Sequence, residues 1–69
     1  MTLQDQYVAA LIQFGGRHVP SRSKKYVTFT RFSGGFFFVG KSGSVREGQT
    51  YKDSIPSSGA FKRYLLTLL

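Results

Sequence analysis

The chain has 69 residues and no cysteine, and its ten lysines and arginines against three acids give it a formal net charge of +7. A chain this short buries only about 60% of its unfolded surface, so we expect one basic binding domain over residues 1–69 that works through its surface. The missing cysteines exclude disulfides and thiolate metal sites, and they favour a reducing, cytoplasmic compartment.

The first expected element is a helix over residues 2–14, because apolar residues recur there at helical spacing. These residues are Leu3, Tyr7, Ala10, Leu11 and Phe14. Thr2 and Asp5 are typical of a capping box at the start of the helix, and the following pair of glycines favours its end. Residues 17–25 contain a proline, two serines and four cations, which is typical of an exposed loop.

The next segment predicts a β-hairpin, with strands over residues 26–32 and 36–39 and a tight turn at residues 33–35. A two-residue turn places four apolar side chains on one face, expected to be the core face: Val27, Phe29, Phe36 and Phe38. The other face then carries Tyr26, Thr28, Thr30, Phe37, Val39 and Lys41. A three-residue loop reverses this match, because side chains alternate along a strand.

Residues 44–48 predict a short third strand with Val45 as its buried residue. After a loop at residues 54–58, helical spacing returns at Phe61, Tyr64, Leu65 and Leu68. The expected fold is therefore a small single α+β domain in the order helix-strand-strand-strand-helix. Its three-stranded antiparallel sheet packs on the two helices.

The expected element order resembles in outline the double-stranded RNA-binding domain. The places that correspond to that family's functional loop and basic helix start read SGG at residues 33–35 and SGAFKR at residues 58–63. Neither matches the family's motifs, so no residue role is carried over. The stretch GGFFFVG also resembles the aromatic strand of RNA-recognition motifs, although most of its phenylalanines are needed in the core of so small a domain.

The stretch GFFFVGKS at residues 35–42 matches the G-x-x-x-x-G-K-[ST] pattern of a phosphate-binding P-loop. A P-loop needs space for phosphates and a following helix whose positive end faces them. Here three phenylalanines and a valine fill the variable positions, and the residues after Ser42 have no helical periodicity. We therefore predict a strand and a turn rather than a nucleotide site.

The sequence offers few groups for other catalytic or metal chemistry. Its one histidine, His18, lies in the basic loop, and the acids Asp5, Glu47 and Asp53 are scattered along the chain. General acid–base catalysis needs a group within hydrogen-bond reach of the substrate, and a metal site needs several convergent ligands. We expect no enzyme activity, no cofactor, no metal and no small-molecule substrate.

The positive charge favours an acidic partner. The leading expectation is DNA or RNA, bound through phosphate contacts from basic loops. The candidate cations are Arg17, Arg22, Lys24, Lys25, Arg31, Lys41, Arg46, Lys62 and Arg63. Tyr26 and Phe37 are candidate stacking residues, provided that they are exposed.

A second expectation belongs to another class: a small virus- or plasmid-type regulator that binds an acidic surface of a host protein complex such as RNA polymerase. A third interpretation is a solvated positive surface with no specific ligand. No membrane partner is expected, because no apolar stretch approaches about 18 residues and the segment FKRYLLTLL is short, with leucines needed in the core.

Overall fold

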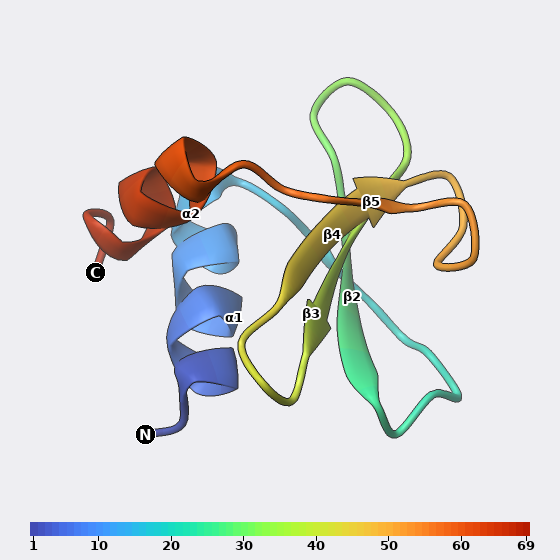
Figure 1. Ribbon diagram of the computed structural model, residues 1–69, viewed down its shortest axis with the longest axis horizontal. Coiled ribbons are helices and arrows are strands. Elements are labelled where there is room, and N and C mark those ends of the chain that lie inside the picture. Colours follow the sequence, from blue (N-terminus) through green and yellow to red (C-terminus); the bar gives the residue numbers. More distant parts are fainter.

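The computed structural model describes residues 1–69 and contains two helices and five strands. In chain order the elements are α1 (Leu3–Phe14), β1 (His18–Val19), β2 (Tyr26–Thr30), β3 (Phe36–Gly40), β4 (Val45–Gly48), β5 (Ile55–Pro56) and α2 (Gly59–Leu66). Neighbouring strands are antiparallel, and the open sheet follows the order β1-β2-β3-β4-β5. Both helices lie on the same side of this sheet (Figure 1). The expected α+β class is confirmed.

The expectation of a three-stranded sheet is wrong, because two further strands of two residues each form the edges. Both fall in segments that were expected to be loops. Two residues are too few to show an alternating pattern, so these strands arise from pairing with their neighbours rather than from a local signal. His18 pairs with Phe29, and Ile55 pairs with Glu47. Pro56 lies on the outer strand β5, where its missing N–H is tolerated.

Helix α1 begins and ends as its sequence predicts. The Thr2 hydroxyl accepts a hydrogen bond from the Asp5 backbone N–H at 3.1 Å, and the Asp5 carboxylate accepts one from the Thr2 N–H at 3.3 Å. Gly15 ends the helix in the left-handed conformation, with φ at 106°. The buried residues of α1 are Tyr7, Ala10 and Leu11. The helix therefore contributes one apolar side to the core.

The β2–β3 hairpin turns through three residues. The Arg31 N–H donates to the Gly35 carbonyl at 3.0 Å, which leaves Phe32, Ser33 and Gly34 as the loop. Gly34 and Gly35 have φ values of 91° and 89°, a region that glycine adopts readily and other residues do not. The three-residue loop sets a register different from the one that a two-residue turn gives.

In this register β2 keeps its expected faces, whereas the side chains of β3 lie on the faces opposite to those expected. Phe29 lies opposite Phe37, and both are buried in the core cluster under the helices. Phe36 and Phe38 were expected in that core, but they lie on the other face of the sheet. The expectation was wrong because adding one loop residue moves every side chain of the second strand to the opposite face.

Aromatic rings connect the sheet to both helices. The Phe37 ring stacks on Phe61 of α2, with centroids 5.5 Å apart and planes at 12°, and Phe14 of α1 packs edge-on against both at 6.2 and 5.4 Å. Ser58 caps α2 by accepting from the Phe61 N–H at 3.1 Å, and Leu65 is fully buried. Neither helix has the length and apolar character needed to span a bilayer.

Candidate binding surface

The sheet face turned away from the helices, here called the open face, carries the candidate site. The strand register places one row of residues across it: Val19, Thr28, Phe38, Arg46 and Pro56. Phe38 is only 5% exposed although it faces away from both helices. Tyr26 and Tyr51 bury it, because their rings pack edge-on against the Phe38 ring at centroid distances of 5.5 and 5.6 Å.

Tyr26 and Tyr51 also stack on each other, with ring centroids 4.3 Å apart and planes at 2°. Tyr26 is the first residue of β2 and is half-buried, whereas Tyr51 lies between β4 and β5 and keeps 44% of its surface exposed. The pair is thus partly buried against Phe38 and partly open to solvent. The solvent-exposed part of these rings is available for contact with another planar group.

The β4–β5 loop holds Tyr51 in this position. A Cβ at Gly48 would lie 2.8 Å from the Ser54 Cα, so the loop can return close to β4 only because this residue is glycine. The Ser54 hydroxyl donates to the Tyr51 carbonyl at 2.6 Å, and the Asp53 N–H donates to the Thr50 hydroxyl at 3.2 Å. These bonds fix the loop across the open face.

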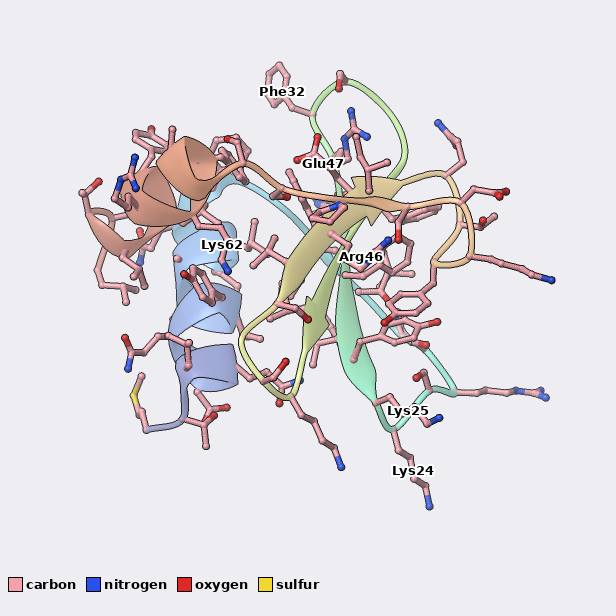
Figure 2. All side chains as sticks on the ribbon, in the orientation of Figure 1. Lys24, Lys25, Phe32, Arg46, Glu47 and Lys62 are labelled. Atoms are coloured by element: carbon pink, nitrogen blue, oxygen red, sulfur yellow. The ribbon has the colours of Figure 1, made fainter.

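Arg46 links the sheet to this loop. Its Nε donates to the Ser54 hydroxyl at 2.8 Å, its Nη2 donates to the Ser54 carbonyl at 2.6 Å, and its Cζ lies 5.9 Å from the centre of the Tyr51 ring. The guanidinium therefore combines two hydrogen bonds with a cation–π contact. Figure 2 shows Arg46 on the side of the sheet opposite the helices.

Three exposed lysines surround one end of the β2–β3 hairpin, here called the lysine end: Lys24, Lys25 and Lys41. Tyr26 pairs with Gly40, so Lys25 and Lys41 occupy neighbouring strand ends. Figure 2 shows Lys24 and Lys25 together at this lower end. A fourth exposed lysine, Lys52, directly follows Tyr51 in the chain. Each tyrosine of the pair therefore has a lysine next to it in the chain, Lys25 before Tyr26 and Lys52 after Tyr51.

Lys41 lies in a second three-residue loop, formed by Lys41, Ser42 and Gly43. The Gly40 N–H donates to the Ser44 carbonyl at 2.8 Å, and Gly43 has a φ of 84°. The stretch that matches the P-loop pattern is thus strand β3 followed by a hairpin turn, which confirms the prediction of a strand and a turn.

The three acids are used within the fold. Asp5 belongs to the α1 capping box, Glu47 accepts from the Ser57 hydroxyl at 2.8 Å, and Asp53 accepts from the Thr50 hydroxyl at 3.2 Å. Each carboxylate thus accepts its hydrogen bond from a hydroxyl or a backbone N–H rather than from a lysine or an arginine. The charge of the lysine end stays available to an acidic partner.

The structure contains no pocket, and no group of three or more histidines, cysteines and acids is placed to hold a metal ion. No family model, curated protein or solved structure matches this chain. The features that mark a candidate site are therefore the geometry and charge of the open face.

The remaining predicted cations lie elsewhere. Arg17 and Arg31 are at the opposite end of the hairpin, where the Thr30 N–H donates to the Arg17 carbonyl at 2.9 Å. Arg22 is exposed in the loop before β2. Lys62 and Arg63 are on α2, and the Lys62 ammonium lies 5.4 Å from the Tyr7 ring on the helical side of the molecule (Figure 2). The nine cations thus form no single patch.

Of the two predicted stacking residues, only Tyr26 is partly exposed. Phe37 is 5% exposed and packs between the helices and the sheet, so it is a core residue. Sequence reasoning also missed Tyr51 and Lys52. The dipeptides Lys25-Tyr26 and Tyr51-Lys52 are a weak signal by themselves, and only the fold brings them together.

Proposed function

We propose that this protein is a non-enzymatic binding protein for single-stranded nucleic acid, which it contacts through the open face. The observation that carries the proposal is the Tyr26–Tyr51 stack, whose two segments each carry an exposed lysine beside the tyrosine, Lys25 and Lys52. Such a combination of aromatic platform and cations is typical of proteins that bind single strands with little sequence preference.

The two parts of the site have different tasks. Lysines of the lysine end contact phosphates, which gives affinity that falls steeply with salt and carries no sequence information. The tyrosines stack on a base, which is worth about 1–3 kcal/mol per base and tolerates any base because each has a π-face. A duplex offers phosphates but keeps its base faces stacked, so the aromatic contribution favours a single strand.

The lack of cysteine supports a reducing, intracellular site of action for this binding protein.

The test is a titration of labelled single-stranded DNA and RNA, and of the matched duplexes, at two salt concentrations. We expect the single strands to bind more tightly than the duplexes, and the logarithm of the binding constant to fall by about 0.7 per phosphate contact for each tenfold rise in salt. Equal affinity for single strands and duplexes would show that base stacking contributes nothing to binding. Binding no tighter than that of an arbitrary protein of similar charge would overturn the proposal.

The second candidate function is binding to an acidic surface of a larger protein complex, such as a polymerase. It is supported by the same exposed lysines and by Tyr51, since tyrosine often provides much of the affinity at protein interfaces. A protein that fails to distinguish oligonucleotides from other polyanions, yet captures a defined acidic protein through Tyr51, would favour this candidate.

A further inference from the structure

A second aromatic side chain lies at the end of the hairpin opposite the lysine end. Phe32 is 97% exposed, more than any other large apolar residue of the chain. Figure 2 shows its ring projecting from the side of the β2–β3 loop that faces the helices. Isolated apolar side chains are common on protein surfaces. Three features distinguish this one.

The first feature is that the loop holds Phe32 in a defined position. Backbone hydrogen bonds run from the Arg31 N–H to the Gly35 carbonyl at 3.0 Å and from the Gly34 N–H to the Arg31 carbonyl at 3.3 Å. The Arg31 guanidinium donates to the Ser33 hydroxyl at 3.1 Å, which closes the loop with a side-chain bond. Because the loop backbone is already ordered, binding through Phe32 requires ordering of its side chain only.

The second feature is that the turn itself does not need a phenylalanine. The β3–β4 loop has the same length and the same closing bond, here from the Gly40 N–H to the Ser44 carbonyl, with a serine at its second position and a glycine with positive φ at its third. The two loops differ at the residue that follows, where Gly35 has a positive φ and Ser44 does not. The first position of the β3–β4 loop is occupied by Lys41, at the place that Phe32 takes in the other loop. A polar side chain therefore occupies the equivalent position of a similar loop. The turn does not require a phenylalanine there, which leaves the Phe32 ring available for a ligand.

The third feature is positive charge beside the ring. Arg31 directly precedes Phe32. Two hydrogen bonds join Arg17 to Thr30. The Thr30 N–H donates to the Arg17 carbonyl at 2.9 Å, and the Arg17 N–H donates to the Thr30 hydroxyl at 3.1 Å. Two arginines thus lie at the base of the loop that presents the phenylalanine.

We propose that Phe32 stacks on a base of the bound nucleic acid, while Arg17 and Arg31 contact the phosphates next to that base. This proposal rests on the proposed function and adds a second contact point to it. The five residues of β2 separate the lysine end from the tip by about 17 Å, so a strand of several nucleotides reaches both. Aromatic stacking on bases combined with cationic contacts to the backbone is the usual way in which proteins bind single strands.

The test compares four chains for binding a labelled single strand of about 16 nucleotides, the upper range for one small domain. Phe32→Ala is expected to weaken binding by about fivefold to about a hundredfold, with an unchanged salt dependence. Phe32→Tyr keeps a stacking ring and is expected to bind like the parent, whereas Phe32→Leu keeps only apolar surface and is expected to bind less tightly. Thermal unfolding of each variant should match that of the parent, because the side chain is exposed.

A 2-aminopurine base in the same strand reports stacking directly. Its fluorescence should be quenched by the parent and less so by Phe32→Ala. If the parent binds the strand and Phe32→Ala binds equally well with equal quenching, the Phe32 contact is overturned while the proposed function stands. If the parent binds no oligonucleotide, the proposed function is overturned, and the Phe32 proposal with it. A duplex that binds as tightly as the single strand, with the same weakening in Phe32→Ala, would overturn the single-strand part of both.

Discussion

The rings of Tyr26 and Tyr51 stack with their centroids 4.3 Å apart, although one residue opens β2 and the other lies in the loop after β4. Both rings also pack edge-on against Phe38. On the open face, the two rings therefore cover Phe38 and at the same time present aromatic surface to solvent. Substitutions at Tyr51 separate these two roles.

Tyr51→Ala is expected to weaken single-strand binding by about 1–3 kcal/mol, because the platform keeps only one of its two rings. The same variant should lower the free energy of unfolding by about 1 kcal/mol, because no ring then packs against Tyr26 and Phe38 from this loop. Tyr51→Phe keeps the ring and should retain both properties. Oligonucleotide titration and urea unfolding measure the two effects, and parent-like affinity in Tyr51→Ala would contradict the stacking role.

The lysine end can be tested against cations on the helical side. The double variant Lys24→Gln, Lys25→Gln removes two charges near the tyrosines, and Lys62→Gln, Arg63→Gln removes two charges on α2. The first pair should weaken binding and lower the salt slope by about 0.7 for each phosphate that the protein no longer neutralises. The second pair should change the slope little. Equal effects from both would mean that net charge, and not the open face, governs binding.

Two phenylalanines of the hairpin should differ sharply in their effect on stability. Phe37 is buried between the sheet and Phe61, whereas Phe32 is 97% exposed. Phe37→Ala is expected to cost about 3–5 kcal/mol, a large share of the roughly 3–10 kcal/mol that holds a domain of this size. Phe32→Ala should cost close to nothing. Urea unfolding measures both, and comparable effects in the two variants would contradict the three-residue loop register.

The helices and the central hairpin could be predicted because their signals are local. Thr2 and Asp5 form the expected capping box. Ser58, the last residue of the loop expected at residues 54–58, caps α2. The faces of the second strand were not predictable, since RFSGG permits both two- and three-residue loops and one residue of difference moves every side chain of that strand to the opposite face. The edge strands β1 and β5 form only by pairing with β2 and β4, and no local sequence pattern shows that pairing.

The candidate site was predicted in part. Tyr26, Lys24, Lys25 and Lys41 were among the expected residues, but charge by itself did not distinguish the three lysines from Lys62 on the helical side. The platform depends on long-range geometry: the β4–β5 loop must return across the open face before one tyrosine meets the other. That return is set by Gly48 and by the bonds around Ser54, which hydrophobic patterning does not reveal.

Gly48→Ala tests this dependence directly. The new Cβ would lie 2.8 Å from the Ser54 Cα, so the backbone of the β4–β5 loop has to shift, carrying Tyr51 with it. We expect a decrease in stability of about 1–3 kcal/mol, as for other overpacked sites, together with weaker single-strand binding. Gly59→Ala is the matched control: its Cβ meets only the Arg63 guanidinium at 3.7 Å, and at the first residue of α2 the change should leave stability and affinity close to those of the parent. A Gly48→Ala protein with parent-like stability and affinity would show that the loop positions Tyr51 without the close approach to β4.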